Sequence, residues 1–358
     1  MKIIEVGLGN RSYPIMAAAG LLAGIGQDLR QRAIAKRYVV VADDRVAGLY
    51  GNQLMDSLAG AGLSCELLTF AHGEASKNMT TIAGLARSLA RLGVDRKDCL
   101  IALGGGVTGD ITGFVAAIYM RGIPFVQVPT TLLAQVDSSV GGKTGVDIPE
   151  GKNLVGVFYQ PRAVYIDSRV LSSLPLAELL NGLAEVIKYG VIYDREFFDF
   201  LAANREQILA LQLPVIEEVI VRCCWIKAAV VAADEKEADL RRILNYGHTL
   251  GHAVEAASQF SIAHGMAVAM GMVAANKLAM AKSLLAPQEA DLISRLVADF
   301  GLPVAIPAEL DRQLMKSFLK TDKKTVAGRP FFVLPTCVGK VIITDDVSEE
   351  LIDQALEA

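Results

Sequence analysis

Three consecutive glycines, Gly104, Gly105 and Gly106, followed by Val107, Thr108 and Gly109, place the tightest constraint on how this chain can fold. Residues 99–103 before them form a short apolar run typical of a buried strand, and residues 111–120 after them are apolar at helical spacing. The pattern GxGxxG between a strand and a helix is typical of a turn that lets a dinucleotide pyrophosphate approach the backbone at a helix N-terminus. We therefore expect a parallel α/β sheet around this turn.

Short β-branched runs alternate with helical stretches through the first half of the chain. Strands are expected at 37–42, 65–70, 99–103 and 125–129, and helices at 54–58, 80–92 and 111–120. Repeated strand–helix units are typical of a parallel sheet covered by helices. After Leu174 the sequence becomes rich in alanine, leucine and glutamate, with few strand candidates. We expect an α/β N-terminal domain with a Rossmann-like parallel sheet at 1–174, and a mainly α-helical C-terminal domain at 175–358.

The composition narrows the class of protein and of partner. A chain of 358 residues, 52% of them hydrophobic, can bury the cores of two domains, and a net charge of −4 favours neither nucleic acid nor an anionic membrane as partner. The five cysteines form no CxxC pair, which is typical of reduced thiols. The N-terminus lacks an export signal, and the most apolar stretch, 266–275, is too short to cross a bilayer. We expect a cytoplasmic protein that binds a small molecule.

One element of the usual dinucleotide fingerprint is missing. About 20 residues beyond the glycines, no acidic residue stands at a strand end to hold the ribose hydroxyls. Asp43, at the end of an earlier strand, and the loop residue Glu74 are the available acceptors. The alternative is a tight strand-to-helix turn without a ligand, which four glycines in six positions make less attractive. We expect a variant of the Rossmann domain.

Histidine is scarce, yet three of the four histidines, His248, His252 and His264, lie close together in the sequence. Arg241, Asn245, His248 and His252 follow spacings of four, three and four, so on a helix they would line one face. That face would be polar and basic.

A second polar face is expected on an earlier helix, where Asn181, Glu185 and Lys188 follow spacings of four and three. Gly247 and Gly251 each precede a histidine, and glycine in a helix costs about 1 kcal/mol relative to alanine. Their presence indicates that another chain segment or a ligand approaches closely. The two polar faces could then face each other.

Histidine nitrogens together with a glutamate oxygen are the ligands that zinc and similar divalent ions prefer. Spacing alone favours His248 and His252 as the ligand pair. The alternative is a histidine pair that only hydrogen-bonds to its neighbours. His264 and Glu185 favour the metal over this alternative.

Two glycine-rich loops carry the remaining candidates, Lys143, Lys152 and Asn153. They do not form a Walker A loop, because Asp137 stands where its first glycine would be. The lysines could pair with a phosphate or carboxylate, and the asparagine could hydrogen-bond hydroxyls. Two solvated lysines on flexible loops remain the alternative.

Five sequence runs together identify a family. The chain resembles 3-dehydroquinate synthase, a sugar phosphate cyclase related to the glycerol dehydrogenases, in GGGVTGD (104–110), PTTLLAQVDSS (129–139), GGKTG (141–145), GLAEVIK (182–188) and LNYGHTLGH (244–252). The resemblance implies a carbon–oxygen lyase that uses NAD and one divalent metal, zinc or cobalt. It would convert 3-deoxy-D-arabino-heptulosonate 7-phosphate to 3-dehydroquinate and phosphate, a step towards the aromatic amino acids, as a homodimer.

The resemblance also implies roles for individual residues. Glu185, His248 and His264 would hold the metal, with His252 in the reaction centre, which replaces the ligand pair chosen from spacing. Substrate would contact Asp137, Lys143, Lys152, Asn153, Lys188, Lys227, Arg241, Asn245 and Lys324, with Lys323 as the alternative to Lys324. NAD would contact Asp43, Glu74, Lys77, Gly105, Gly106, Val107, Gly109, Asp110, Thr130, Thr131, Lys143, Lys152, Leu171, Ser172 and Ser173. Arg45 and His72 depart from residues common in the family, which concerns the fit of the cofactor.

Rival functions would use the same features differently. A polyol dehydrogenase of the glycerol dehydrogenase kind would release NADH, and another sugar phosphate cyclase would need no site for a carboxylate. A non-catalytic nucleotide-binding module would use His248 and His264 only as core residues. The lysine-rich loops and Arg241 favour a phosphorylated acid as substrate.

Overall fold

The computed structural model describes residues 1–321 and 330–357, which form two compact units. The first contains Met1–Leu174 and Ile216–Lys236, and the second contains Pro175–Val215 and Glu237–Ala358. The sequence analysis placed Ile216–Lys236 in the C-terminal domain. It clusters with the first unit because Glu217 accepts a hydrogen bond from the Ala19 amide (2.6 Å) and Cys224 Sγ lies 3.3 Å from the Gln135 carbonyl.

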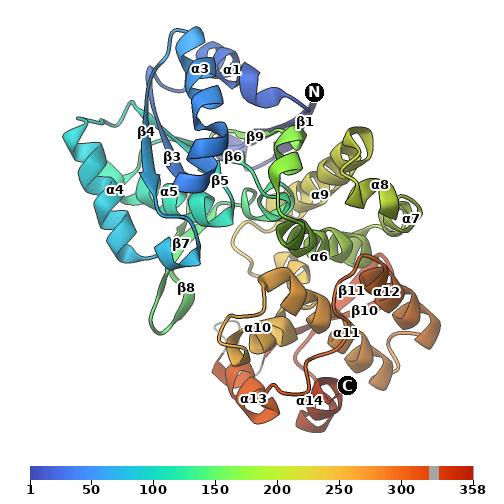
Figure 1. The fold of residues 1–358 in the computed structure, drawn as a ribbon. Coiled ribbons are helices and arrows are strands. Elements are labelled where there is room, and N and C mark those ends of the chain that lie inside the picture. The colour runs from blue at the N-terminus through green and yellow to red at the C-terminus, as the bar shows by residue number, and fades with distance from the viewer. Residues whose placement is uncertain (322–329, 358) are drawn as a thin grey trace. The chain divides into compact units, whose positions relative to one another are not determined.

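The first unit is organised around a seven-stranded sheet (Figure 1). Its strands stand in the order β1-β2-β9-β6-β5-β3-β4, and all neighbours are parallel except β1 and β2. Their bounds are Lys2–Val6 (β1), Tyr13–Ala17 (β2), Val164–Ile166 (β9), Phe125–Pro129 (β6), Cys99–Gly104 (β5), Arg37–Asp43 (β3) and Ser64–Phe70 (β4). The four strands expected from β-branched runs are confirmed, as is the α/β class. The sequence analysis did not detect β1, β2 and β9.

Helices cover both faces of this sheet (Figure 1), as the alternation of its side chains requires. Val40 of β3 and Ile101 of β5 pack against α1 (Ile25–Arg32) and α3 (Asn52–Gly60). Val39 and Leu100 point the other way, against α4 (Met79–Arg91) and α5 (Gly106–Ile118). The unit also contains α2 (Asp44–Val46), most of α9 (Leu213–Ala233) and the short turns η1 (Gly9–Arg11), η2 (Leu21–Gly24), η3 (Ala47–Gly51), η4 (Glu74–Ser76), η5 (Tyr119–Arg121), η6 (Ala134–Ser138) and η7 (Ser168–Ser173).

The two expected glycine-rich loops form a β-hairpin instead. β7 (Lys143–Ile148) pairs antiparallel with β8 (Gly151–Phe158). A Cβ on Gly145 would lie 2.6 Å from the Val155 carbonyl oxygen, and one on Gly156 would lie 2.2 Å from that of Thr144. These glycines therefore permit close pairing of two strands, which a sequence pattern does not distinguish from loop flexibility.

The second unit is mainly helical, as expected. Its helices are α6 (Leu176–Tyr193), α7 (Arg195–Ala203), α8 (Arg205–Leu209), α10 (His248–Ala257), α11 (His264–Ala281), α12 (Pro287–Asp299), α13 (Arg312–Thr321) and α14 (Glu349–Leu356), with the 3₁₀ turn η8 (Leu240–Asn245). A hairpin of β10 (Phe332–Cys337) and β11 (Lys340–Thr344) was not expected. Within the described ranges, none of the helices has the length and apolarity needed to span a membrane.

Candidate metal centre and cofactor site

The glycine turn lies between a strand and a helix, as predicted. Gly104 ends β5, Gly105 precedes the first turn of α5, and Gly106 begins the helix. Gly105 has no side chain to cap α5, so the first amides of the helix have no cap from that position. A Cβ on Gly109 would meet the Gln127 amide oxygen at 2.6 Å. The glycines therefore serve close packing of α5 on the sheet as well as access to the backbone.

Asp43, the expected ribose acceptor, stands at the carboxyl end of β3, which pairs with β5. Its Oδ2 lies 3.4 Å from the Thr108 hydroxyl on the first turn after the glycines. The chain leaves β3 for β4 on one side and β5 for β6 on the other, so the two strands flank a topological switch point. Ligands of open α/β sheets bind at such points. Asp43 also caps α2 through the Val46 amide, at 2.9 Å.

Lys77 connects several residues predicted for cofactor and substrate. Its buried Nζ lies 2.5 Å from Asp110 Oδ2 and donates to Asn153 Oδ1 at 2.6 Å. The Asn153 amide donates to Asp147 Oδ1 at 2.7 Å, and Asn153 has a φ of 55°, a left-handed conformation that asparagine tolerates. Burial alone would lower the pKa of Lys77, but Asp110 and Glu74 raise it above its ordinary value. Lys77 is therefore a fixed ammonium ion.

Two further predicted substrate residues meet in the first unit. Lys227 on α9 is buried, and its Nζ lies 2.8 Å from Asp137 Oδ1 and 2.5 Å from the Asp137 carbonyl oxygen. The two residues are far apart in sequence, so spacing could not have paired them.

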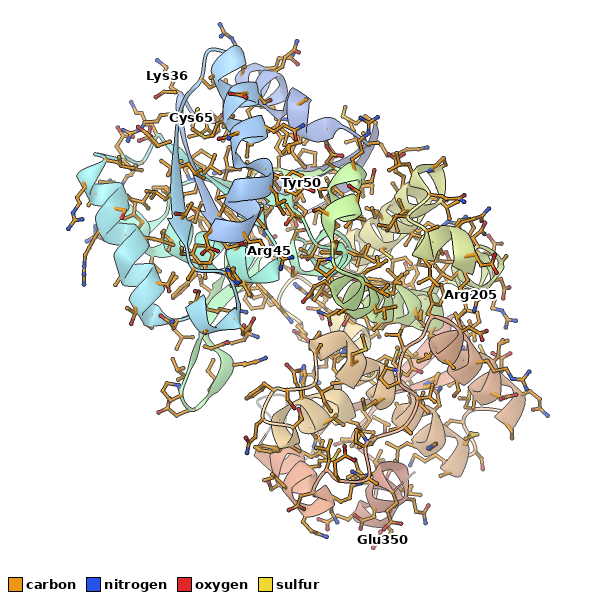
Figure 2. All side chains as sticks on the ribbon, viewed as in Figure 1. Lys36, Arg45, Tyr50, Cys65, Arg205 and Glu350 are labelled. Atoms are coloured by element: carbon orange, nitrogen blue, oxygen red, sulfur yellow. The ribbon has the colours of Figure 1, made fainter. Side chains whose placement is uncertain are left out.

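The other predicted cofactor residues lie at the ends of strands or on the hairpin. Thr130 and Thr131 follow β6, and Leu171, Ser172 and Ser173 lie in η7. Lys143 is exposed on β7 and Lys152 is half-buried on β8. Tyr50, labelled in Figure 2, holds η7 through its hydroxyl, which lies 2.9 Å from the Val170 carbonyl oxygen and 2.6 Å from Ser173 Oγ. Sequence analysis gave no signal for Tyr50.

The expected single helical face from Arg241 to His252 is wrong. Arg241 and Asn245 belong to the 3₁₀ turn η8, and α10 starts only at His248. Gly247 between them has a φ of 78°, which ends the helical path. Arg241 is buried, and Asn245 Nδ2 donates to Glu237 Oε1 at 2.6 Å. The spacing of four and three residues was compatible with a helix but did not require one.

Close approach at the second-unit glycines is confirmed, and two further glycines share it. A Cβ on Gly251 would lie 2.8 Å from the Ala267 carbonyl oxygen of α11, and one on Gly271 would lie 1.9 Å from that of Gly247. At Gly265, next to His264, a Cβ would lie 2.1 Å from the Asn181 carbonyl oxygen of α6. The Gly265 amide donates to Asn181 Oδ1 at 2.5 Å. These contacts fix α10 and α6 against α11.

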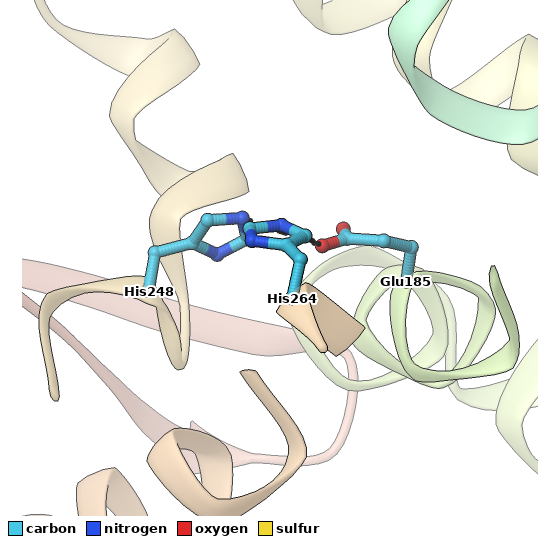
Figure 3. Close-up of side chains that lie close together, drawn as sticks. All are labelled: Glu185, His248 and His264. Atoms are coloured by element: carbon cyan, nitrogen blue, oxygen red, sulfur yellow. Dashed lines mark ion pairs between the residues drawn. The ribbon is translucent and has the colours of Figure 1, made fainter. Parts of the chain in front are cut away.

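Glu185, His248 and His264, which we call the metal group, meet where these three helices approach (Figure 3). Nε2 of His248 lies 3.3 Å from Glu185 Oε1, and Nε2 of His264 lies 3.4 Å from the same oxygen. One ligand atom of each residue lies within 4.8 Å of the others. His248 Nδ1 lies 3.1 Å from the Tyr246 carbonyl oxygen, which leaves Nε2 facing Glu185. The side of α6 that carries Glu185 and the start of α10 at His248 therefore face each other, as predicted.

The donor set fits a divalent ion. Both Glu185 oxygens are buried, and neither has a hydrogen bond of normal geometry among the described residues, although Lys188 forms an ion pair with Oε2. Burial alone would raise the pKa of Glu185, but Lys188 and His248 lower it well below its ordinary value. Burial alone would lower the pKa of His264, but Glu185 and Glu255 raise it to about 9. A carboxylate held ionised beside two imidazoles is a suitable site for zinc or cobalt.

His252 lies beside the metal group. Its ring centroid is 5.4 Å from that of His248 and 5.9 Å from that of His264. Lys188 is buried next to Glu185 on α6. Lys323 and Lys324, predicted for substrate, lie outside the described residues.

Glu255 is a further residue of this site that was not predicted from the sequence. It is buried on α10, three residues after His252, and therefore lies on the helical face that carries both histidines. The spacing that singled out His248 and His252 could have found it.

Comparison with known proteins decides the family. The model of the 3-dehydroquinate synthase N-terminal domain matches residues 67–181, and that of the C-terminal domain matches residues 182–325. A 3-dehydroquinate synthase from Desulforamulus reducens is 48% identical over 350 residues, which is 98% of each chain. The chain belongs to the 3-dehydroquinate synthase family.

Two solved structures of related cyclases have the same fold as this 3-dehydroquinate synthase family member. One is the 2-epi-5-epi-valiolone synthase ValA of Streptomyces hygroscopicus, solved with NAD⁺ and Zn²⁺ bound. Its TM-score is 0.89 at 30% sequence identity, and the match covers 96% of this chain and 95% of that chain. The other is 2-deoxy-scyllo-inosose synthase with carbaglucose-6-phosphate, NAD⁺ and Co²⁺, with a TM-score of 0.91, 28% identity and 99% coverage of both chains.

Proposed function

We propose that this chain is a 3-dehydroquinate synthase that uses NAD and one divalent metal ion, zinc or cobalt. Its substrate would be 3-deoxy-D-arabino-heptulosonate 7-phosphate and its products 3-dehydroquinate and phosphate, in the shikimate route to aromatic amino acids. The observation that carries the proposal is the metal group, in a chain 48% identical to a 3-dehydroquinate synthase over almost its whole length.

The two cofactors supply chemistry that side chains lack: NAD accepts and returns a hydride, and the metal ion acts as a Lewis acid on substrate oxygens. Glu185, His248 and His264 would hold the metal. In the first unit, the glycine turn would receive the pyrophosphate of NAD and Asp43 its ribose hydroxyls, supported by the place of both at adjacent strand ends.

The remaining NAD contacts are carried over from the family. Lys77 and Asp110 form one ion pair, and Glu74 lies in the same charged cluster. Thr130, Thr131 and the η7 residues Leu171, Ser172 and Ser173 would complete the cofactor site. Lys143 and Lys152 would take part in both cofactor and substrate binding.

The reaction begins with transient oxidation of a substrate hydroxyl to a ketone, which acidifies the neighbouring carbon. Phosphate, held by Lys152 and Asn153, then leaves by β-elimination and takes up the proton lost from that neighbouring carbon. The ketone is reduced again, and ring opening with an intramolecular aldol closure forms the product. Orientation of the open chain can contribute up to about 10 kcal/mol to the last step.

The other substrate residues would bind charge and move protons. Lys188 and Arg241 are buried cations suited to the substrate carboxylate or phosphate, and Asn245 would hydrogen-bond its hydroxyls. Lys227 and Asp137 form a fixed ion pair that would orient polar groups of the substrate. His252 would relay a proton, supported by its place beside His248 and His264.

A turnover assay tests the proposal against its rivals. The protein is mixed with catalytic NAD, Zn²⁺ or Co²⁺ and the heptulosonate phosphate, and phosphate and 3-dehydroquinate are measured while absorbance follows NADH. Equal release of both products without accumulation of NADH is expected. Accumulating NADH would instead identify a polyol dehydrogenase. Turnover of glucose 6-phosphate or a heptulose 7-phosphate, with none of the heptulosonate, would identify another sugar phosphate cyclase.

We also propose that the protein is a cytoplasmic homodimer. None of the five cysteines, all of which lie in the described part of the chain, forms a disulfide, which is typical of a reducing compartment. Exposed apolar side chains suited to a subunit interface are Ile118 at the end of α5, Met120 in η5, and Leu154, Val157 and Phe158 on β8. Light scattering tests the dimer, and a monomer at micromolar concentration would contradict it.

A further inference from the structure

Glu255 contacts the metal group from the side opposite Glu185. Nδ1 of His264 lies 3.2 Å from Glu255 Oε2, while Nε2 of the same ring lies 3.4 Å from Glu185 Oε1. The His264 ring is therefore held between two carboxylates, one at each nitrogen. Glu255 is buried, with 6% of its surface exposed, and reaches the partly exposed ring of His264 from the interior.

The two histidines of the metal group are held in different ways. The Nδ1 contact of His248 is a neutral backbone carbonyl, that of Tyr246, at 3.1 Å. His264 instead has a carboxylate at Nδ1. A hydrogen bond from the second ring nitrogen to a carboxylate fixes the tautomer and orientation of a ligating histidine and increases its basicity. The strength of His264 as a ligand should therefore depend on Glu255, whereas that of His248 depends on the backbone.

The position of His264 explains why such support is needed. It is the first residue of α11, so its backbone is fixed on one side only by the helix. Gly265 holds that end of α11 against Asn181 of α6. Glu255, on α10, fixes the ring from a third element.

Glu255 also belongs to a second group of residues with metal-ligand spacing. His252, Glu255 and His264 each place one ligand atom within 4.8 Å of the others. A metal at that group would use Nδ1 of His264, the nitrogen that contacts Glu255. Because Nε2 of His264 and Nε2 of His248 both face the same buried oxygen of Glu185, Oε1, we favour the first group as the ion site.

We propose that Glu255 is a positioning residue that orients His264 through its Nδ1 and thereby sets the affinity of the metal group for its ion. The inference rests on the metal site of the proposed function and adds to it a residue that does not itself touch the ion. It predicts that the carboxylate controls metal affinity without changing the number of ions bound.

The experiment compares Glu255→Ala and Glu255→Gln with the intact protein. Glu350→Gln is the matched control, because Glu350 is an exposed carboxylate on α14 of the same unit (Figure 2). The dissociation constant for Zn²⁺ is measured by competition with a chelator, bound metal is counted, and the visible spectrum of the Co²⁺ form reports the ligand set. Melting of the metal-free proteins measures stability separately.

The alanine variant should bind one ion about 10- to 100-fold more weakly, with a changed Co²⁺ spectrum. The glutamine variant, whose amide oxygen can still accept from Nδ1, should lose less affinity and keep the spectrum, and the control should match the intact protein. If the alanine variant does not fold, the glutamine variant serves as the test, because its neutral amide should raise the basicity of His264 less than the carboxylate does and so weaken Zn²⁺ binding measurably. An unchanged dissociation constant in that variant would overturn the proposal. Wild-type affinity in the alanine variant also overturns it, even with a lowered melting temperature.

Two other outcomes distinguish failure of this inference from failure of the proposed metal-dependent function. Two ions in the intact protein and one in Glu255→Ala would make Glu255 a ligand of the second group, which overturns positioning but leaves a metal enzyme. No ion in the intact protein would overturn the metal-dependent function and this inference together.

Discussion

The glycine turn of the first unit comes from one continuous stretch of chain, whereas the metal group of the second unit combines α6 with α10 and α11, which follow much later in the sequence. In the turn, the glycines face side chains: a Cβ on Gly105 would approach Thr131 Cγ2 at 3.0 Å. Around the metal group, the glycines face backbone: a Cβ on Gly265 would lie 2.1 Å from the Asn181 carbonyl oxygen. Side chains can adjust and packed backbone cannot, so the metal group should depend more strongly on the fold around it.

Metal removal should have the largest effect and concerns only the second unit. Dialysis against a chelator should abolish turnover, because Glu185, His248 and His264 would lose the ion that they are arranged to hold, and added Zn²⁺ or Co²⁺ should restore it. NAD binding, measured by calorimetry, should change much less. Full turnover after verified removal of metal would contradict the account.

The next largest effect is expected at Gly265. Gly265→Ala places a methyl group against the backbone of α6 and should lower the free energy of unfolding by about 3 kcal/mol, with weaker metal binding. Denaturant unfolding checks the stability. Gly84→Ala is the control, because Gly84 lies on the exposed face of α4 with nothing within 4 Å of a Cβ there, and the variant should gain up to about 1 kcal/mol. Equal stability of the two variants would argue against backbone packing as the support of the metal group.

Gly105→Ala should affect ligand binding more than stability, the opposite of Gly265→Ala. Its methyl group needs only a small movement of Thr131, so the free energy of unfolding should fall by less than about 1 kcal/mol. The methyl group would stand at the entry to α5, so NAD should bind about tenfold more weakly, equivalent to about 1.4 kcal/mol. Calorimetry with NAD tests this. Unchanged NAD affinity together with lost stability would give the glycine a structural role only.

His72→Ala should have the smallest effect. Its Nδ1 lies 2.8 Å from Asp44 Oδ1, but both side chains are exposed, and such ion pairs contribute at most about 1 kcal/mol. Stability and NAD affinity should both remain near those of the intact protein. A large loss of NAD affinity would mean that this departure from the family pattern alters cofactor binding.

The sequence predicted what depends on continuous stretches of chain. The strand, turn and helix around Gly105 have periodic apolar residues and glycines in a fixed order, and they fold as expected. The hairpin of β7 and β8 was not predicted. Glycines such as Gly145 and Gly156 occur both in flexible loops and where two strands pair closely, and the sequence pattern does not distinguish the two. A local sequence pattern therefore predicts a helix, strand or turn only where a single backbone geometry accounts for the pattern.

The metal group required more than spacing. Periodicity favoured His248 and His252, four residues apart on one helix, and the resemblance to the family replaced His252 by His264. The structure gives the physical reason for preferring His264: its Nε2 faces Glu185 across the contact between α11 and α6 that Gly265 permits. Glu255 followed the same periodicity but was overlooked, because its contact with His264 depends on the same tertiary packing.

The metal content of single variants is the most direct test of whether Glu185, His248 and His264 hold an ion. Glu185→Ala, His248→Ala and His264→Ala are purified beside His72→Ala and the intact protein, and bound zinc or cobalt is measured per chain after exposure to a slight excess of ion and removal of unbound ion. The account predicts one ion per chain in the intact protein and in His72→Ala, and nearly none in the other three. One ion per chain in all five proteins would contradict it.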